Sequence, residues 1–289
     1  MGVEGTVGGG MHALPADSHV HSEWSWDTWV GDMEGTCARA VEIGLPAVAF
    51  TEHVDHVVWT ADRGTLEASR EVRAFADAAG RVRAPVFDAA GYLAGVERCR
   101  ERFPGLRVLS GVEIGEPHLH AEAVARILGA GRFDRVLGSL HGLPVGVTFY
   151  EPPGLFEHYG RDAALRRYLG QVPAVIAGSA VFEVFAHIDY PVRAWPVDAE
   201  PFDPWAFEEE FRLALGAIAA GDRVLEVNTR VPLHPEILRW WREEGGRAIS
   251  FGSDAHLPAA LATGFREAAH VAEAHGFRPS RRPEDYWIC

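Results

Sequence analysis

The stretch Asp17-Ser18-His19-Val20-His21 decides how the rest of the chain is interpreted. A short apolar segment with Leu14 and Ala16 leads into it, which predicts a buried strand that ends in a polar cluster. Side chains at positions i and i+2 of a strand point to the same side, so His19 and His21 can direct both imidazoles at one metal ion. Taken alone, the pair is equally well explained as two surface histidines. Similar clusters at the ends of almost all later strands favour the metal site.

Composition narrows the class of protein. The 289 residues, 47% of them hydrophobic, suffice for one α/β barrel with a large core. No apolar run approaches the roughly 18 residues of a membrane span and no signal segment is evident, so we expect a cytoplasmic protein without membrane contact. The net charge of -14 argues against a nucleic-acid partner but does not exclude an anionic substrate, because metal ions or arginines can reverse the local field. Cys37, Cys99 and Cys289 are too scattered for a disulfide framework.

Short apolar strands alternate with helical patterns along the chain. After the first strand, we expect strands at 47–50, 107–112, 135–137, 181–185, 223–227 and 248–251. Helices are expected at 33–44, 65–79, 88–103, 120–129, 204–220, 234–244 and 259–275, with one or two more before 181. A loop is expected at 144–154, and the Gly-rich residues 1–12 are expected to be a disordered leader to a single domain at 13–289.

Each expected strand is followed at once by His, Asp, Glu or Asn-Thr-Arg. Alternating strands and helices with polar residues at the carboxyl ends of the strands are how a (β/α) barrel builds an active site on one face. An open doubly wound sheet would place ligands only near its switch point. The sequence therefore predicts an α/β barrel of about seven strands, with its site at their carboxyl ends.

Six histidines and three carboxylates gather at these strand ends. They are His19, His21, Asp27, His53, Glu113, His141, His187, Asp254 and His256. A zinc ion takes about four ligands, so this set suits two or three divalent ions, especially if Glu113 bridges two of them. Mixed imidazole and carboxylate donors favour zinc, iron or manganese. Clustered metals screen a phosphoryl group and activate water, so hydrolysis is the reaction class that this set favours.

The motifs at the strand ends resemble those of the polymerase and histidinol phosphatase (PHP) family. They are DSHVH at 17–21, TEH at 51–53, GVE at 111–113, SLH at 139–141, HID at 187–189 and GSDAH at 252–256. The run LEVNTR at 225–230, followed by HPEIL and GSDAH, resembles the histidinol phosphatase branch most closely. The resemblance covers 17–265 and implies a distorted seven-stranded (β/α) barrel, the PHP fold.

The resemblance also implies a trinuclear site and a reaction. One ion would be held by His19, His21, Glu113 and Asp254, a second by Glu113, His141 and His187, and a third by Asp27, His53 and His256. A metal-bridging hydroxide would attack the phosphorus of a small phosphomonoester in line, with L-histidinol phosphate as the first choice of substrate. Glu113 and Asp254 would thus be central to catalysis.

Several neighbouring residues have both a functional and a structural explanation. Arg193 and Arg230 follow strand ends and are assigned to catalysis as phosphate-binding groups, with a surface ion pair as the alternative for each. Glu52, Asp189 and Asp17 are expected to orient histidines rather than bind metal. His56 and His158 are expected to be structural or exposed. His118 and His120 are expected to face solvent, with contact to the substrate as the alternative for one of them. Trp24, Trp26 and Trp29 either pack under their loop or form a wall against the substrate.

Two departures from the family pattern keep other functions open. The interval 57–104 matches no motif, and the tryptophan-rich turn is unusual. A sister phosphatase acting on a sugar, nucleoside or amino-alcohol phosphate is therefore an alternative. A phosphodiesterase or nuclease of the same family and a non-catalytic metal-binding scaffold are further alternatives.

Overall fold

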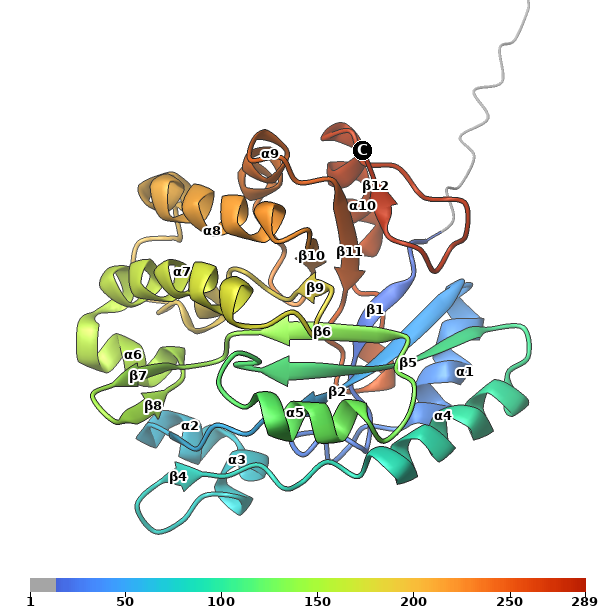
Figure 1. Ribbon diagram of the computed structural model, residues 1–289, viewed down its shortest axis with the longest axis horizontal. Helices are drawn as coiled ribbons and strands as arrows, with labels where there is room; N and C mark the ends of the chain where they lie inside the picture. The colour runs from blue at the N-terminus through green and yellow to red at the C-terminus, as the bar shows by residue number, and fades with distance from the viewer. Residues whose placement is uncertain (1–13) are drawn as a thin grey trace, which may run out of the picture.

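Seven parallel strands form the centre of the structure, a computed structural model that describes residues 14–289. The leader expected at 1–12 lies outside the described residues. The strands are β1 (Asp17–Val20), β2 (Ala47–Val54), β5 (Arg107–Gly115), β6 (Arg135–Ser139), β9 (Val184–Phe185), β10 (Val224–Asn228) and β11 (Ala248–Gly252). They lie side by side in chain order (Figure 1), so the expected barrel-like succession is confirmed.

Some strand bounds differ from the expectation in a way that matters for the site. β1 begins at Asp17, so the polar cluster forms the strand itself instead of following it. β2 and β5 continue to Val54 and Gly115, which places the TEH and GVE motifs inside the strands. β9 is only Val184–Phe185, shorter than the expected 181–185. The motif residues of β1, β2 and β5 are thus held by sheet hydrogen bonds and not by loops.

The sheet curls until its first and last parallel strands meet. Val20 of β1 pairs in parallel with Ala255, just after β11. The amide of His21 donates to the carbonyl of Ala255 (2.9 Å), and the amide of Asp254 donates to the carbonyl of His19 (2.8 Å). The start of β11 instead pairs with the antiparallel β12 (Trp287–Ile288). The closure is therefore local to the carboxyl ends of the strands, and the fold is a distorted (β/α)7 barrel.

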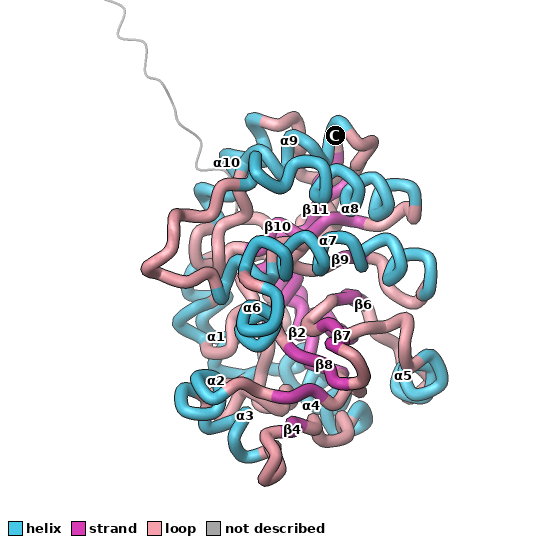
Figure 2. The backbone as a smooth tube through the Cα atoms, turned by 90° about the vertical axis from the view of Figure 1, so that its left-hand side faces the viewer, coloured by secondary structure: helices cyan, strands magenta, loops and turns pink. Residues whose placement is uncertain are grey.

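Helices surround the strands (Figure 2). They are α1 (Met33–Ile43), α4 (Ala89–Arg102), α5 (Ala121–Leu128), α6 (Pro152–Tyr159), α7 (Arg161–Gly178), α8 (Glu208–Ala220), α9 (Pro235–Glu243) and α10 (Phe265–Ala274). Short 3-10 turns lie at Tyr190–Ala194, Pro204–Phe207 and Pro258–Ala260, and the last of these explains why the helix expected at 259–275 begins only at Phe265. None of the helices within 14–289 is long and apolar enough to cross a membrane.

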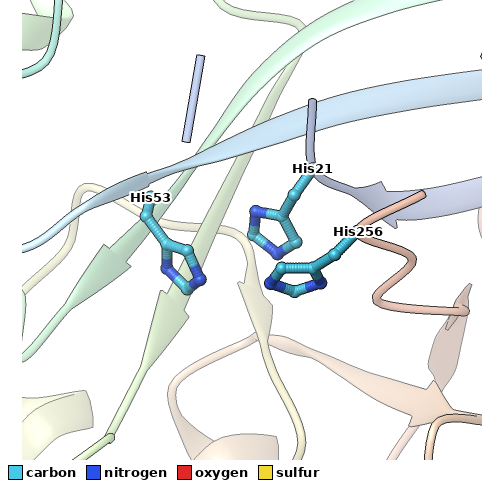
Figure 3. Close-up of side chains that lie close together, drawn as sticks. All are labelled: His21, His53 and His256. Atoms are coloured by element: carbon cyan, nitrogen blue, oxygen red, sulfur yellow. The ribbon is translucent and has the colours of Figure 1, made fainter. Parts of the chain in front are cut away.

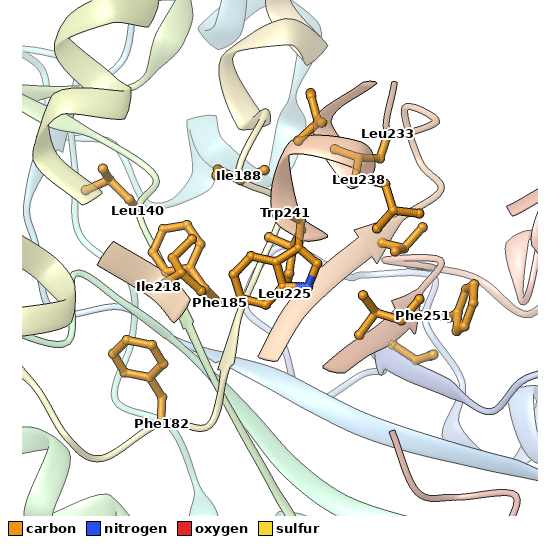
Figure 4. Close-up of a cluster of buried hydrophobic side chains, with 14 of the residues drawn as sticks. Leu140, Phe182, Phe185, Ile188, Ile218, Leu225, Leu233, Leu238, Trp241 and Phe251 are labelled. Carbon is orange, nitrogen blue, oxygen red and sulfur yellow. The ribbon is translucent and has the colours of Figure 1, made fainter. Parts of the chain in front are cut away.

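One large apolar cluster fixes the strands of the second half of the sheet. Trp241 of α9 and Ile218 of α8 are fully buried with Phe185, Leu225 and Phe251 of the strands (Figure 4). Burying each such side chain contributes about 1.5–3 kcal/mol. This packing holds the strands whose carboxyl ends lead into His187 and Asp254.

A second, smaller sheet is a feature that the sequence did not predict. It has the order β4 (Arg81–Val82), β3 (Trp59–Thr60), β8 (Thr148–Tyr150) and β7 (Leu143–Val145). The loop expected at 144–154 is therefore wrong, since most of it is a β-hairpin that turns at Gly146 with φ 65°. The helix expected at 65–79 is two short helices, α2 (Arg63–Ala68) and α3 (Arg70–Ala74), because Ser69 caps the second one.

Candidate metal centre

The nine side chains predicted as metal ligands converge at the carboxyl ends of the parallel strands. The register of β2 and β5 sets His53 directly beside Glu113. The closure between β1 and the end of β11 brings His19 and His21 next to Asp254. Asp254 and His187 both have positive φ, at 53° and 27°, a strained backbone for residues other than glycine. Such strain costs on the order of 1–3 kcal/mol and is commonly found at functional sites.

The first group of ligand atoms surrounds one point. The Nε2 atoms of His19 and His21 lie 3.1 Å apart. Glu113 Oε2 is 3.2 Å from His19 Nε2 and 3.5 Å from His21 Nε2. Asp254 Oδ1 is 3.2 Å from His21 Nε2 and 3.9 Å from His19 Nε2. Four ligands of a tetrahedral zinc at roughly 2.0–2.1 Å lie about 3.3 Å from one another, so these spacings fit an ion at the centre.

The second group uses the other oxygen of Glu113. Glu113 Oε1 lies 2.7 Å from His187 Nε2 and 3.1 Å from His141 Nε2. The two carboxylate oxygens therefore face different sets of imidazoles. This is the arrangement that a carboxylate bridging two ions requires.

The third group lies at the outer side of the first. Asp27 Oδ2 is 3.0 Å from His256 Nε2 and 3.4 Å from His53 Nε2. Figure 3 shows His53 and His256 on either side of His21, whose ring centroid is 4.3 and 4.4 Å from theirs. The other nitrogen of His53, Nδ1, lies 3.2 Å from Glu113 Oε2, so this imidazole of the third group also contacts the first group.

The nine side chains fit the binding of divalent cations better than a network of hydrogen bonds among themselves. Glu113 Oε2 and His187 Nδ1 are buried and have no hydrogen-bond partner within the described residues. Burial raises the pKa of Glu113, but the charges of His19 and His53 outweigh this and hold it well below its usual range. Burial, together with His53 and His256, lowers the pKa of His21 to about 3, so this imidazole is neutral and its nitrogen lone pair is available to a metal.

Glu226 is a functional residue that the sequence reasoning missed. Its Oε1 lies 2.6 Å from Nδ1 of His19, and its Oε2 accepts the amide of His187 at 2.7 Å. A carboxylate that holds Nδ1 leaves Nε2 free to face a metal, and such partners are typical of metal-binding histidines. A glutamate between Leu225 and Val227, in the middle of an apolar strand, was the signal that could have found it.

Asp55 is a second residue that was missed, and it lies just past β2. Its Oδ1 is 3.4 Å from His141 Nδ1, and its Oδ2 is 3.5 Å from His53 Nδ1. The indole of Trp26 donates to Oδ2 at 2.8 Å. Asp55 therefore connects the second and third groups from outside the ligand set.

The three carboxylates expected to orient histidines have different surroundings. Glu52 contacts its histidine through Ser25, whose hydroxyl donates to Glu52 (2.6 Å) and lies 3.1 Å from His21 Nδ1. Asp17 instead accepts the amide and hydroxyl of Ser253, so it joins β1 to the end of β11, and no imidazole within residues 14–289 bonds to it. No histidine ring bonds to Asp189 in residues 14–289. Burial raises the pKa of Asp189 to about 6, and the charge of Arg193 opposes this rise.

A cavity of about 710 Å³ opens onto the metal groups. Both predicted phosphate-binding arginines line it. Arg193 is 18% exposed, with Nη2 2.7 Å from Asp254 Oδ2. Arg230 is 49% exposed, with Nη1 3.5 Å from Asp254 Oδ1 and 3.2 Å from His256 Nδ1. Both guanidinium groups thus lie next to predicted ligands and face the space that a substrate would fill.

The three tryptophans of the first loop have three different roles. Trp24 packs against Gly91 and Gly95 of α4, where a Cβ atom would lie 2.7 and 3.1 Å from the indole. Trp26 lines the cavity, and Trp29 is exposed beneath the guanidinium of Arg70. Of the three, only Trp26 therefore lies at the cavity. The four remaining histidines of interest do not line the cavity: His56, His118, His120 and His158.

This fold and site define a class of protein. The family description of the PHP domain matches residues 17–230, and the chain belongs to this family. The expected membership of the PHP family is therefore confirmed.

Particular relatives share most of the chain. A histidinol-phosphatase of Lactococcus lactis subsp. lactis (strain IL1403) is 22% identical over 248 residues, which cover 83% of this chain and 84% of the relative. A probable histidinol-phosphatase of Clostridium acetobutylicum is 29% identical over 181 residues, which cover 60% and 70%. The crystal structure of histidinol phosphate phosphatase from Lactococcus lactis, complexed with Zn, L-histidinol and phosphate, has a TM-score of 0.76. It is 19% identical and the match covers 94% of this chain and 98% of that one, which shows a shared fold.

Proposed function

We propose that this protein is a metal-dependent phosphomonoesterase that hydrolyses L-histidinol phosphate to L-histidinol and phosphate. The observation that carries the proposal is the convergence of six imidazoles and three carboxylates on a cavity that two arginines also line. The relatives named as histidinol-phosphatases support the choice of substrate. The structure of such an enzyme with zinc, L-histidinol and phosphate supports both the metal and the ester.

Two or three divalent ions would be held by the three groups described above. Zinc, iron and manganese all suit this mixture of imidazole and carboxylate donors. Ions bound there supply the positive charge that screens a phosphoryl group, and they lower the pKa of water. Glu113 spans the first and second groups, whereas Asp27, His53 and His256 form the outer one. The removal of any residue of the first group should therefore lower metal content as well as turnover.

The two arginines position the phosphate in this proposal. The ion pair with Asp254 holds Arg193 beside the first group, and the N–H groups not used in that pair can donate to phosphate oxygens. Arg230 is more exposed and contacts the outer group through His256. We therefore assign Arg193 to the bound phosphate near the ions and Arg230 to the capture of the incoming ester.

A sister phosphatase acting on another small phosphomonoester is the second candidate. The observation that favours it is that much of the cavity wall comes from the segment 59–72, which matches none of the family motifs. Trp59, Thr65 and Glu71 contribute to this wall. Sugar, nucleoside and amino-alcohol phosphates are the substrates to compare.

The test is a phosphate-release assay on protein of measured metal content. The panel contains L-histidinol phosphate and the other small esters just named, each assayed with zinc-, manganese- and iron-loaded protein. We expect L-histidinol phosphate to give the highest kcat/KM. Faster release from another ester would favour the second candidate, and a fully metallated protein inert towards the whole panel would refute both.

A further inference from the structure

One carboxylate of the cavity wall, that of Glu151, makes no ion pair within the described part of the chain. The other acidic side chains that line the cavity are each within 4.0 Å of an arginine or histidine: Asp27, Asp55, Glu71, Glu113 and Asp254. The side-chain partner of Glu151 is instead the hydroxyl of Tyr190, which donates to Oε2 at 3.1 Å. The chain contains no lysine, and His141, whose charge acts on Glu151, lies within 4.0 Å of Asp55 and Glu113 instead.

The local sequence explains why the side chain of Glu151 does not cap its own helix, α6. It is the N-cap residue of α6, a position where a polar side chain usually accepts a backbone amide of the first turn. Pro152 and Pro153 have no N–H to offer, and the side chain makes no capping hydrogen bond. Tyr190 fixes the carboxylate at the cavity instead. Burial raises the pKa of Glu151 to about 7, and the charge of His141 and the hydrogen bond from Tyr190 only partly oppose this rise.

A small side cavity beside Glu151 concentrates further negative charge. It measures about 20 Å³ and is lined by three acidic side chains, those of Glu151, Glu116 and Asp55, and by one imidazole, that of His141. That volume is enough for one group of the size of water or ammonium. Glu116 is only 3% exposed; its Oε1 accepts the amides of His141 and Gly142 (2.7 and 2.9 Å), while its Oε2 makes no hydrogen bond within residues 14–289. A carboxylate oxygen without a hydrogen-bond donor beside a cavity of this size favours a donor group, such as a cationic nitrogen, as the occupant.

Tyr190 sets the distance between this acidic region and the metal groups. Its ring lies 5.0 Å from the ring of His187 and 5.2 Å from that of His141, centroid to centroid, and its hydroxyl is bonded to Glu151. Glu151 is therefore about one tyrosine side chain away from the second ligand group. A substrate whose phosphate lies at that group and whose ammonium nitrogen follows along P–O–C–C–N would span this separation.

We infer that Glu151 is a specificity-determining residue, whose carboxylate pairs with a cationic nitrogen in the organic half of the substrate. Glu116 and Asp55 strengthen the negative field around it. The enzyme would then prefer cationic phosphomonoesters, the class to which L-histidinol phosphate belongs, over neutral ones. The inference rests on the proposed function for the position of the phosphate.

The turnover test compares Glu151→Gln with the wild type on matched esters. O-phosphoethanolamine carries an ammonium group, 2-hydroxyethyl phosphate is its neutral counterpart, and L-histidinol phosphate is the third substrate. We expect Glu151→Gln to lower kcat/KM about 10- to 100-fold for the two cationic esters, through KM, and less than about threefold for the neutral one. Glu157→Gln removes a charge from the exposed side of the same helix and should change none of these values. An equal loss on all three esters would overturn the inference.

A binding measurement separates this inference from the proposed function. L-histidinol and inorganic phosphate are titrated separately by calorimetry into metal-loaded wild type, Glu151→Gln and Glu151→Asp. We expect Glu151→Gln to weaken L-histidinol about 10-fold or more and to leave phosphate unchanged, while Glu151→Asp, which keeps the charge, retains part of the L-histidinol affinity. The same pattern in a protein that hydrolyses no ester would support the inference and refute the function. Normal hydrolysis of L-histidinol phosphate, together with unchanged L-histidinol binding in Glu151→Gln, would support the proposed function and refute the inference.

Discussion

At the scale of the residue, the metal centre depends on how three of its imidazoles are held at Nδ1. Glu226 contacts Nδ1 of His19, Ser25 contacts that of His21, and Asp55 lies near that of His141. In each case Nε2 is left to face the carboxylates of the first or second group. A partner at Nδ1 fixes both the tautomer and the ring orientation, and it makes the imidazole a better ligand.

Glu226→Gln should weaken metal binding without removing a ligand. An amide at this position lacks the charge that favours the His19 tautomer with Nε2 free, so we expect zinc affinity to fall about 10- to 100-fold. Competition with a chromophoric chelator measures this affinity. Glu183→Gln, at the exposed position just before β9, is the matched control. Wild-type affinity in Glu226→Gln would show that the 2.6 Å contact has no role in metal binding.

Arg230→Ala should act mainly on KM. Its guanidinium is half exposed and lies at the outer group, so it meets the ester early and is screened by solvent in the bound state. We expect KM for L-histidinol phosphate to rise about 10-fold with kcat changed less than about threefold. Steady-state kinetics at two salt concentrations check this. A loss confined to kcat would place Arg230 in the chemical step instead.

Sequence motifs predict the metal ligands well, but they predict poorly the residues that hold those ligands in place. The nine candidate ligands are recognisable because imidazoles and carboxylates recur just where apolar runs end. Glu226 acts on His19 from 207 residues away, and only the closed barrel brings the two together. Glu151 is unremarkable in the sequence, and its lack of a counter-ion is a property of the folded cavity. The assignment of the nine residues to individual ions stays a prediction.

At the scale of the element, Asp17 connects the first and last parallel strands. Its carboxylate accepts the amide and hydroxyl of Ser253 and the amide of Ala262, at 3.0, 2.5 and 3.0 Å. Those bonds hold β1 against the chain that follows β11, where His19 and Asp254 meet. The sequence placed Asp17 beside a histidine, but the partner is a strand end that lies 236 residues further along.

Asp17→Asn should therefore destabilise the whole protein. The amide nitrogen cannot accept a hydrogen bond, so at least one buried donor loses its partner, at a cost of about 1–3 kcal/mol. Urea unfolding at pH 8 measures the change, because burial raises the pKa of Asp17 to about 6 and the carboxyl group is ionised there. Asp162→Asn on the exposed side of α7 is the control. A change below about 0.5 kcal/mol in Asp17→Asn would mean that the closure is held by other contacts.

Element prediction succeeded where apolar periodicity was strong and failed where short elements depend on tertiary pairing. The strands β2, β5, β10 and β11 and the helix α4 were found within a few residues of their bounds. β3, with only two residues, is a strand only because β4 and β8 pair with it. No local pattern predicts such pairing, which is why the small sheet was missed.

At the scale of the whole molecule, the fold brings together ionisable groups whose protonation a bound metal would change. Burial lowers the pKa of His53, but the carboxylates of Asp27 and Glu113 outweigh this and raise it to about 10. The pKa values of His19 and His141 are likewise well above the usual range, because nearby carboxylates outweigh burial. These directions favour the protonated form of the three imidazoles at pH 7 in protein stripped of metal.

Zinc binding should therefore release protons. A ligating nitrogen cannot keep its proton, so the metal displaces protons from imidazoles whose pKa lies above the working pH. We expect net proton release at pH 7, and an affinity that rises with pH between 7 and about 10. Calorimetric titration of metal-free protein in buffers of different ionisation enthalpy measures the number of protons. Binding without proton release would contradict the charge states assigned to these imidazoles.

The single domain expected at 13–289 and the cytoplasmic location stay predictions.

The central claim is that the histidine and carboxylate cluster makes the protein a metal-dependent phosphatase. Its most direct test is the rate of phosphate release from L-histidinol phosphate by chelator-stripped protein as zinc is added back, with Asp254→Ala in parallel. We predict that activity is absent without metal, rises to saturation at two or three zinc ions per chain, and does not return in Asp254→Ala, which should also hold less zinc. Full activity in the stripped protein, or in Asp254→Ala, would contradict the account.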